Sequence, residues 1–463
     1  MSSEHDRGSG TGATLGEMGR IVDRGAPAPG GAFDEHRPPD PMLIGDCVHC
    51  GFCLPTCPTY VLWGEEMDSP RGRIYLMKEG LEGEPLSDVM VSHWDACLGC
   101  MACVTSCPSG VQYDTLIEQT RAQVERRHER SARDKALRGL IFSLFPYPRR
   151  LKLLRGPLRA LQLTGLDRAM RRTGLLDRMA PHLAAMERLA PRLGKPQPLP
   201  PYIRALGERR TVVGLLTGCV QGAFFPGVNA ATARVLQAEG CDVVVPKAQG
   251  CCGALSVHNG REPEGQDFAR QLIDTFEATG VEHVVVNAAG CGSTMKEYAR
   301  LLEGDPAYAE RARVFGESVR DVAELLDELG PVAPRHPLEL TVAYHDACHL
   351  AHAQGVRAQP RRLLEAIPGL ELKEIAEAEL CCGSAGVYNI LNPEPANELG
   401  ERKAANIVAT GAQVLVTANP GCLMQVAAAF ERSSHSMGMA HTVEVLDASI
   451  RGASLPVSPH EGD

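Results

Sequence analysis

Residues 47–58 read CVHCGFCLPTCP, and residues 97–108 read CLGCMACVTSCP. Both runs follow the pattern C-x2-C-x2-C-x3-C-P, a spacing that holds [4Fe–4S] clusters. Thiolates suit such clusters because soft sulfur is the preferred ligand of iron–sulfur chemistry. Three cysteines spaced in this way can wrap a turn around one cluster, while the proline keeps the fourth cysteine from turning back with them. The two runs therefore predict two clusters that share ligands between the copies.

The ligands are expected to pair across the two runs, as they do in the bacterial ferredoxins that this pattern resembles. The first cluster would take Cys47, Cys50, Cys53 and Cys107, and the second would take Cys97, Cys100, Cys103 and Cys57. Gly51 and Gly99 lie between ligands, where a glycine lets the backbone approach a cluster. The alternatives are two zinc sites or disulfides, but zinc motifs usually show two cysteine pairs instead of a triplet followed by C-P. Two clusters this close together indicate an electron relay.

The overall composition is that of a globular protein with about two to four domains. The chain has 463 residues, of which 44% are hydrophobic, and a net charge of −10, so no basic field calls for nucleic acid. Neither a long apolar run nor a secretory signal is seen, so we expect a cytoplasmic protein without a transmembrane helix. Seventeen cysteines in such a chain indicate metal ligation more than disulfides. Cys241 falls outside every ordered set and is expected to be a buried apolar thiol.

Changes in composition divide the chain into five segments. We expect a disordered tail at 1–39, a two-cluster domain at 40–115, a basic helical linker at 116–205, and two related domains at 206–330 and 335–450. The tail is rich in Gly, Ser, Ala and Pro and lacks apolar periodicity. Between the cysteine runs, Arg71 and Arg73 either lower the charge cost of anionic clusters or lie in solvent.

Residues 121–172 form a cationic stretch with fifteen Lys and Arg against four acids. Leucines alternate with these charges, and Pro146, Pro148 and Pro157 interrupt the helical pattern. One interpretation is a linker whose leucine stripe packs on a neighbouring domain. The other two are a docking surface for an acidic partner and a face for an anionic membrane.

The C-terminal half contains an internal repeat. Three cysteine landmarks of the first copy recur in the second copy at offsets of 129, 130 and 131 residues, in the pairs Cys219 and Cys348, Cys251 and Cys381, and Cys291 and Cys422. Three landmarks that keep nearly one offset indicate a duplicated unit.

Strand and helix patterns alternate within each unit. In the first we expect strands at 212–216, 242–245 and 283–287 and helices at 227–239 and 268–279. In the second we expect strands at 340–345 and 414–418 and helices at 360–367 and 395–410. This alternation is typical of parallel sheets covered by helices. We therefore expect an α+β or α/β protein, with a small α-helical ferredoxin-like module, a helical linker and two α/β units.

Each unit places four cysteines close to the ends of its strands, where sites form in parallel sheets. The candidate iron–sulfur ligands are Cys219, Cys251, Cys252 and Cys291 in the first unit, and Cys348, Cys381, Cys382 and Cys422 in the second. Adjacent cysteines rarely bond to each other, because the small ring is strained. The alternative is a core of redox-silent thiols. His345, His349 and His352 lie beside Cys348 and are expected to hydrogen-bond or relay protons near the site, or to bind a metal.

This layout resembles the cysteine-rich CCG domain that occurs twice in one of the subunits of heterodisulfide reductase and in iron–sulfur subunits of flavin dehydrogenases. The resemblance runs from about residue 46 to about residue 446. Four local sequences are similar to the iron–sulfur subunit of glycolate oxidase (glycolate dehydrogenase): SPRGR at 69–73, HDACHL at 345–350, CCGSAG at 381–386 and NPGC at 419–422. The resemblance implies a cytoplasmic or membrane-associated complex in which a separate flavoprotein oxidises glycolate and this subunit carries the electrons on.

The chain departs from the full CCG pattern at one position in each unit. That pattern ends in C-x-x-C, and if Cys291 and Cys422 are its second cysteines, Ala288 and Asn419 stand in place of the first. The missing thiols argue against the non-cubane cluster of the reductase. An ordinary four-thiolate cluster, or no cluster, is left for these units.

Three functions are consistent with these sequence patterns. The first is an electron-transfer subunit that takes electrons from a partner's FAD, carries no flavin itself, and passes them to a quinone or another redox carrier, with peripheral attachment to the inner face of the membrane. The second is a thiol–disulfide reductase subunit with the CCG units as its reaction centre, and the third is a zinc scaffold. Related lactate and glycerol-3-phosphate dehydrogenase subunits share part of the layout, so glycolate and D-lactate are both candidate substrates.

Overall fold

The computed structural model describes residues 27–456. Part of the expected disordered tail, residues 1–26, lies outside this range, and the rest of it is packed. Ala32 and Phe33 are buried, Ala32 N–H donates to the carbonyl of Gly80, and the Phe33 ring lies 5.6 Å from that of Trp94. The expected tail is therefore wrong for residues 27–39, because Phe33 supplies apolar area to a small core that needs it.

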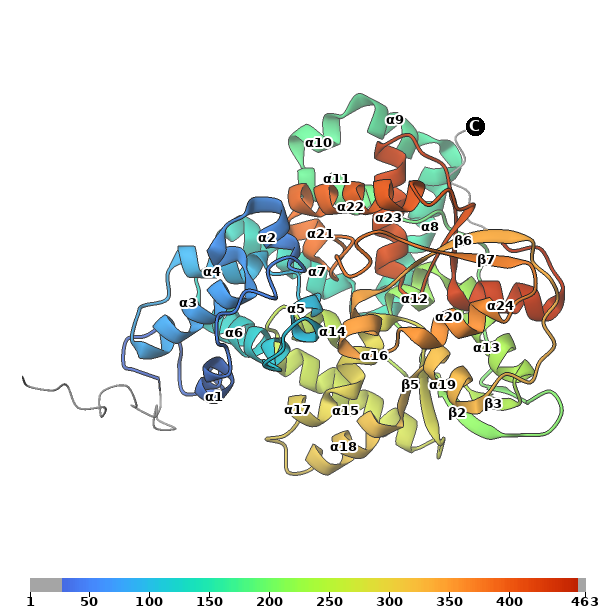
Figure 1. Ribbon diagram of the computed structural model, residues 1–463, viewed down its shortest axis with the longest axis horizontal. Coiled ribbons are helices and arrows are strands. Elements are labelled where there is room, and N and C mark those ends of the chain that lie inside the picture. Colours follow the sequence, from blue (N-terminus) through green and yellow to red (C-terminus); the bar gives the residue numbers. More distant parts are fainter. Residues whose placement is uncertain (1–26, 457–463) are drawn as a thin grey trace, which may run out of the picture.

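The N-terminal domain is helical and forms one end of the molecule (Figure 1). Its helices are α1 (Pro41–Gly45), α2 (Pro58–Trp63), the 3-10 turn η1 (Glu66–Asp68), α3 (Pro70–Glu82), α4 (Asp88–Ala96), α5 (Ala102–Thr105) and α6 (Tyr113–Arg127). Proline opens α2 and α3, where its missing N–H costs nothing, and Ser69 and Ser87 cap α3 and α4. Leu116 and Ile117 of α6 are buried in the core of this domain. The expected boundary at residue 115 is therefore wrong, since it falls inside α6.

Five helices link this domain to the sheets: α7 (Ala132–Leu144), α8 (Pro148–Thr164), α9 (Leu166–Thr173), α10 (Leu175–Met179) and α11 (Pro181–Arg188). The sequence pattern suggested that Pro157 interrupts the helix. Helix α8 instead continues through this proline. Leu151 packs into the core of the first unit, and Phe142 packs with Val387 and Ile390 of the second. The linker thus packs apolar side chains on both neighbouring units, which was the first of its three interpretations.

The first unit is built around a sheet in the order β1-β3-β2-β4-β5, and the second around a sheet in the order β7-β6-β8-β9. Every pairing is parallel except that of β1 with β3. The strands are β1 (Tyr202–Ile203), β2 (Thr211–Leu215), β3 (Cys241–Val244), β4 (His283–Val286), β5 (Val319–Asp321), β6 (Leu340–His345), β7 (Leu370–Glu374), β8 (Val414–Thr417) and β9 (Gly438–His441). The predicted parallel sheets are confirmed. Strand β1 extends the first unit back beyond the expected start at 206.

Helices alternate with the strands in both units. The first unit has α12 (Val220–Phe224), α13 (Pro226–Ala238), α14 (Ala254–Val257), α15 (Glu262–Glu277), α16 (Ala289–Lys296), α17 (Tyr298–Leu301), α18 (Ala309–Ser318) and α19 (Val322–Leu329). The second has the π-helix η2 (His349–Ala353), α20 (Ala358–Glu365), α21 (Tyr388–Leu391), α22 (Pro393–Val408), α23 (Pro420–Arg432) and α24 (Thr442–Arg451). Strands β1, β5, β7 and β9 were not predicted. Edge strand β7 alternates leucine with charge and is only half buried, so its sequence LELKE carries a weak apolar signal.

The two units face each other and share a core. Helix α13 packs on α24, and α20 of the second unit packs on α19 of the first. His441 Nε2–H donates to the carbonyl of Asn287 over 2.8 Å, and Ala289 N–H donates to the carbonyl of Ala418 over 3.3 Å. The carboxyl ends of β4 and β8 therefore approach one another, which brings the two sets of strand-end cysteines together.

Candidate functional site

The two cysteine runs of the N-terminal domain form irregular turns around their thiols. Gly51 and Gly99 both have positive φ, at 87° and 64°, and Gly99 N–H donates to Cys97 Sγ over 3.3 Å. A side chain on Gly51 would meet the guanidinium of Arg71. These turns need glycine because the left-handed conformation aims backbone N–H groups at sulfur.

Cysteines from both runs lie close enough to influence one another. Burial raises the pKa of Cys47, and the nearby Cys107 and Cys50 raise it further. Burial also raises the pKa of Cys103 well above its usual value, with added contributions from Cys100, Cys97, Cys57 and Cys53. Both neighbourhoods contain thiols of the two runs. Cys53 is the exception, since its thiol neighbours are Cys57 and Cys47.

A buried arginine lies beside the second of these neighbourhoods. The Arg73 side chain has no exposed surface, donates to Thr59 Oγ1 over 3.1 Å and to Asp68 Oδ1 over 3.2 Å, and lies 4.0 Å from Cys57 Sγ. Burial alone would lower its pKa, but the anionic groups around it, Cys97 first, raise it overall. Arg73 in turn helps to hold the pKa of Cys97 below its usual value, against the effect of burial. Arg73 thus supplies positive charge at the thiols, whereas Arg71 pairs with Glu66 nearer the surface.

Each CCG unit gathers four thiols at the carboxyl edge of its sheet. Cys219 follows β2, Cys291 lies in α16 after β4, and the pair Cys251–Cys252 precedes α14, with Cys219 Sγ and Cys251 Sγ 3.5 Å apart. The second unit repeats this with Cys348, Cys422 and the pair Cys381–Cys382. All eight are buried except Cys291, which is partly exposed, and none of the cysteines, all of which lie within residues 27–456, is in a disulfide.

The second cysteine of each adjacent pair is the preferred thiolate. Hydrogen bonds from Cys251 and Cys291 hold the pKa of Cys252 well below its usual value despite burial. Cys381 and Cys422 do the same for Cys382. One thiolate surrounded by donating thiols is a ready ligand set for a soft metal centre.

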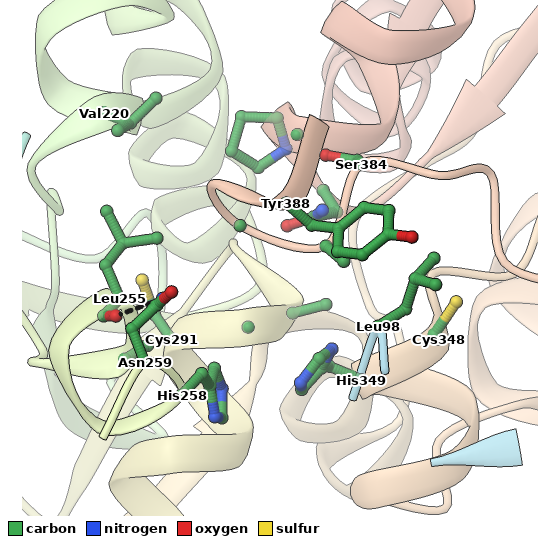
Figure 2. Close-up of a pocket in the computed structure, with 18 of the residues that line it drawn as sticks. Leu98, Val220, Leu255, His258, Asn259, Cys291, Cys348, His349, Ser384 and Tyr388 are labelled. Carbon is green, nitrogen blue, oxygen red and sulfur yellow. Dashed lines mark hydrogen bonds between the residues drawn. The ribbon is translucent and has the colours of Figure 1, made fainter. Parts of the chain in front are cut away.

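Both thiol sets line one cavity of about 190 Å³ between the units. Figure 2 shows His258, Leu255 and Cys291 of the first unit on one side and His349, Tyr388 and Cys348 of the second on the other. Cys97 and Cys100 of the N-terminal domain also line it. Cys100 packs in the same buried cluster as Cys348, and after burial the Cys348 thiol is the largest contribution to its raised pKa. Three cysteine groups that are far apart in sequence are thus contiguous.

Comparisons with known proteins agree with this architecture. Residues 44–111 match the 4Fe-4S dicluster domain, residues 213–296 and 342–427 match the cysteine-rich (CCG) domain, and residues 133–190 match the linker region of the glycolate oxidase iron–sulfur subunit. The probable glycolate oxidase iron–sulfur subunit of Bacillus subtilis is 39% identical over 426 residues, which cover 89% of this chain and 95% of that protein. The chain belongs to the glycolate oxidase iron–sulfur subunit family. A second relative of similar length, the glycolate oxidase iron–sulfur subunit of Escherichia coli, is 36% identical over 88% of this chain and 94% of its own length.

A second group of relatives covers only part of the chain. Lactate utilization protein A of Exiguobacterium is 29% identical over 52% of this chain and 99% of its own length. Membership of this family makes the chain an iron–sulfur electron-transfer subunit of an oxidoreductase complex. Thiol-rich sites lined by buried cation and donating N–H groups fit such clusters. Between residues 27 and 456, no helix combines the length and apolar character needed to cross a bilayer.

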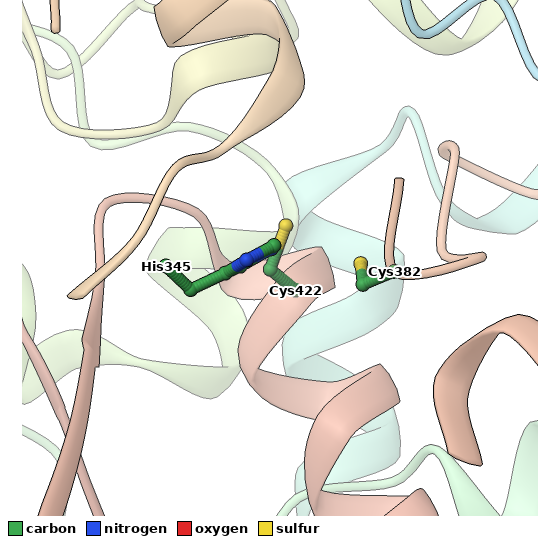
Figure 3. A group of neighbouring side chains, drawn as sticks. All are labelled: His345, Cys382 and Cys422. Atoms are coloured by element: carbon green, nitrogen blue, oxygen red, sulfur yellow. The ribbon is translucent and has the colours of Figure 1, made fainter. Parts of the chain in front are cut away.

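The three histidines near Cys348 in this family member have different surroundings. His352 Nδ1 lies 2.7 Å from Thr105 Oγ1 and 2.6 Å from Arg357, so it contributes to the contact with the N-terminal domain. The His349 ring packs 5.0 Å from that of His258, which the sequence did not single out. His345 lies within 4.8 Å of the Cys382 and Cys422 sulfurs and makes no hydrogen bond through its ring (Figure 3).

The two positions that depart from the full cysteine pattern differ from each other. Asn419 Nδ2–H donates to Cys422 Sγ over 3.4 Å, so in the second unit an amide donor stands where the pattern has a thiol. In the first unit Ala288 is buried and offers no polar side-chain atom. The two CCG units therefore present different surroundings to whatever their thiols bind.

Arg121 and Glu118 of α6 are site residues that sequence reasoning missed. Arg121 donates to the carbonyls of Cys97 and of His258, which joins the second cysteine run to the first unit. Glu118 accepts from His258 Nδ1 over 3.0 Å and pairs with Arg300 over 2.8 Å. Both belong to an ordinary amphipathic helix in the sequence, and only their packing against α14 and α17 gives them a role.

Proposed function

We propose that this chain is the electron-transfer subunit of a flavin-dependent glycolate oxidase complex. A partner subunit binds FAD and oxidises glycolate to glyoxylate, a reaction that removes two electrons and two protons from the substrate. This chain takes the electrons and passes them to an acceptor such as a quinone. Iron–sulfur clusters, when bound, supply the capacity to accept and release electrons one at a time.

The observation that carries this proposal is the buried cluster that Cys100 shares with Cys348. It joins the cysteines of the N-terminal domain to those of the second CCG unit. Thiols of the first unit line the same cavity. A continuous line of thiol sets through the interior is what a relay requires, and a set of independent structural metal sites would not require it.

The ligand assignments follow the sequence motifs. We assign Cys47, Cys50, Cys53 and Cys107 to one [4Fe–4S] cluster and Cys57, Cys97, Cys100 and Cys103 to a second. The four thiols of each CCG unit are assigned to a further cluster in that unit. The positive charge of Arg73 offsets the negative charge of the second set. Arg121 fixes the backbone of Cys97 against the first unit.

The flavin partner is proposed to dock on the linker helices. Leu153 and Leu163 of α8 each have 77% of their surface exposed, next to a helix face with several arginines. Several cations of this stretch serve the fold instead, since Arg155 donates to the carbonyl of Ala223 and Arg171 pairs with Glu187 and Glu431. We propose a cytoplasmic complex, attached peripherally to the inner face of the membrane, where a quinone acceptor would be reached.

Anaerobic reconstitution with the candidate flavoprotein partner tests the proposal. With Cys100→Ser, glycolate should still bleach the flavin, while electron flow to a dye or quinone falls at least about tenfold, because one thiolate ligand is gone. Cys241→Ser is the matched control, since Cys241 is buried in β3 outside every thiol set, and it should leave both half-reactions unchanged. Equal loss of both half-reactions in Cys100→Ser, or protein without iron and sulfide, would refute the relay.

A second candidate function is favoured by the cavity between the CCG units. Its volume of about 190 Å³, with thiols of both units on its walls, suits a small acceptor such as an organic disulfide that takes two electrons within the chain. Reduced protein that cleaves a small disulfide at the rate of glycolate oxidation would support this function over the relay. A screen of glycolate, D-lactate and glycerol 3-phosphate with the reconstituted pair decides the substrate.

A further inference from the structure

His345 is the last residue of β6, at the carboxyl edge of the second sheet. Its side chain is 1% exposed, neither Nδ1 nor Nε2 has a hydrogen-bond partner among nitrogen and oxygen atoms, and the polar group that its ring influences is the Cys382 thiol. A buried polar atom without a hydrogen-bond partner lowers the stability of a protein by about 1–3 kcal/mol, and such atoms are rare in native proteins. A buried imidazole whose nitrogens face only cysteine sulfur is placed to share a metal ion with those thiols.

The groups closest to this imidazole are metal-ligating sulfurs. One ring nitrogen of His345, Cys382 Sγ and Cys422 Sγ all lie within 4.8 Å of one another, and all three residues are buried. Figure 3 shows the ring directed toward the two sulfurs from a different element, with Cys422 on α23 and Cys382 on the loop before α21. Three donors from three elements converge as ligands do.

The first unit lacks this imidazole. The residue at the equivalent place after β2 is Leu216, which packs in the same apolar cluster as Cys219 and Cys251. The repeat preserves the four cysteines, so the two copies differ at this position beside otherwise matching thiols. A leucine in one copy and an unpartnered histidine in the other cannot both serve the same packing role.

We propose that His345 is a metal ligand, and that the second CCG unit holds its iron centre with a mixed histidine and cysteine set while the first uses thiolates alone. This inference rests on the proposed iron–sulfur function of the CCG thiols. Neutral imidazole in place of thiolate raises the reduction potential of an iron–sulfur centre. The second unit, whose Cys348 shares a buried cluster with Cys100, would then be the stronger electron acceptor of the two.

Pulsed EPR of the reduced wild-type protein, grown with ¹⁵N-labelled histidine, tests the assignment without any substitution. The expected result is a strongly coupled nitrogen whose frequencies shift with the isotope. Ferredoxin-type clusters with four cysteines contribute no directly bound nitrogen. The Asn419 amide does not carry the label, so its contact with Cys422 cannot imitate the result. A spectrum in which no strongly coupled nitrogen follows the histidine label would overturn the proposal.

Three variants identify the residue. His345→Leu, which copies the first unit, should abolish the coupling and lower the iron content or change the spectrum of one centre only. His345→Cys should keep the iron, lose the coupling and shift that centre's midpoint potential downward. His349→Leu is the control, because His349 lines the same cavity but lies against His258, and it should keep the coupling. Coupling that survives His345→Leu, or that disappears only in His349→Leu, would refute the assignment.

Failure of this inference is distinct from failure of the proposed function. If glycolate still reduces the two N-terminal clusters through the flavoprotein but no histidine nitrogen couples, the relay stands and the His345 assignment is wrong. Protein that lacks iron in the CCG units altogether, with His345→Leu indistinguishable from wild type, also refutes the assignment. A zinc-only protein refutes both proposals.

Discussion

Arg73 shows how one side chain can link folding to charge balance at the thiols. Its guanidinium is fully buried and donates to the His93 carbonyl over 2.6 Å as well as to Thr59 and Asp68. A buried charge is tolerated only with such partners. Asp68 in turn lies 2.9 Å from His93 Nδ1. The arginine therefore ties η1, α3 and α4 together beside Cys57.

We predict that Arg73→Met lowers the free energy of unfolding of the N-terminal domain by about 3–5 kcal/mol, because it leaves Asp68 without its guanidinium partner. Loss of positive charge should also shift the potential of the neighbouring cluster downward. Denaturant unfolding and a redox titration measure the two effects. Arg71→Met, which removes a partly exposed arginine two residues away, is the matched control and should change neither by a comparable amount. Equal effects of the two substitutions would contradict this account.

His441 makes the contact between the units sensitive to acid. Burial lowers its pKa to about 4, against carbonyls at Asn287 and Ala418 that favour the charged form. The neutral ring donates from Nε2 to Asn287 and accepts Val443 N–H at Nδ1 over 3.2 Å. Protonation removes the acceptor and charges a buried group. Because the folded pKa is depressed, the stability that it contributes is present above the ordinary pKa of 6.5 and is lost as the pH falls toward 4.

We predict that the thermal midpoint falls less steeply between pH 6.5 and pH 4 in His441→Asn than in wild type. Asparagine keeps an oxygen that can cap α24 but carries no charge. The difference corresponds to at most about 3 kcal/mol. Scanning calorimetry across this pH range measures it. The exposed His435→Asn should follow the wild-type profile, and a His441→Asn profile parallel to wild type would show that another group controls the acid response.

The turn between α14 and α15 is where the helical domain meets the first unit. Gly260 has φ +79°, and a Cβ there would overlap the backbone carbonyl of Arg121 in α6. The glycine is thus required twice, for its left-handed conformation and for the close approach of two backbones. Arg121 uses the same contact to reach the carbonyl of His258. This one turn sets how closely α6 can approach α14.

We predict that Gly260→Ala destabilises the protein by about 1–3 kcal/mol more than Gly280→Ala does. Gly280 also has positive φ but has open space around it, so its substitution costs only the conformational strain of about 1–2 kcal/mol. Denaturant titrations of the two variants isolate the clash. Equal losses would mean that α6 and the turn separate at little cost.

At the scale of the whole molecule, ion pairs between the N-terminal domain and the first unit add to the stability that the hydrophobic cores provide. Arg300 of α17 pairs with Asp114 over 3.4 Å and with Glu118 over 2.8 Å, both on α6 of the N-terminal domain. Burial by itself would raise the pKa of Glu118. The hydrogen bond with His258 and the charge of Arg300 outweigh burial and lower this pKa to about 2. Burial and Glu118 raise the pKa of Glu297 to about 7. Charges that are matched this closely fix the orientation of one domain against the other.

We predict that Arg300→Met weakens the docking of the N-terminal domain by about 2–3 kcal/mol, since two largely buried carboxylates lose their guanidinium. Hydrogen exchange should rise in α6 and α17 while the sheets stay protected. Arg313→Met, which removes an exposed arginine paired only within α18, should leave exchange unchanged. Uniform exchange across the chain in Arg300→Met would show global loosening instead of undocking.

Much of the domain organisation could be predicted from the amino-acid sequence. The offset of the cysteine landmarks revealed the duplication, and the strands expected at 340–345 and 414–418 lie within one residue of β6 and β8. The expected tail failed at Phe33, because a buried aromatic outside any periodic segment gives no signal. The boundary at residue 115 failed because α6 serves both its own core and the first unit, and a helix pattern does not state which neighbours it contacts.

Local patterns were enough to establish the cysteine motifs, the parallel αβ units and the family, because ligand spacing and apolar periodicity depend on residues close together in the chain. Long-range packing was needed to bring Cys100 beside Cys348, to bury Arg73 against the thiols, and to leave His345 without a hydrogen-bond partner near Cys382 and Cys422. Those contacts join segments that are distant in the chain, and each depends on the shape of the whole interior instead of on any one stretch of sequence.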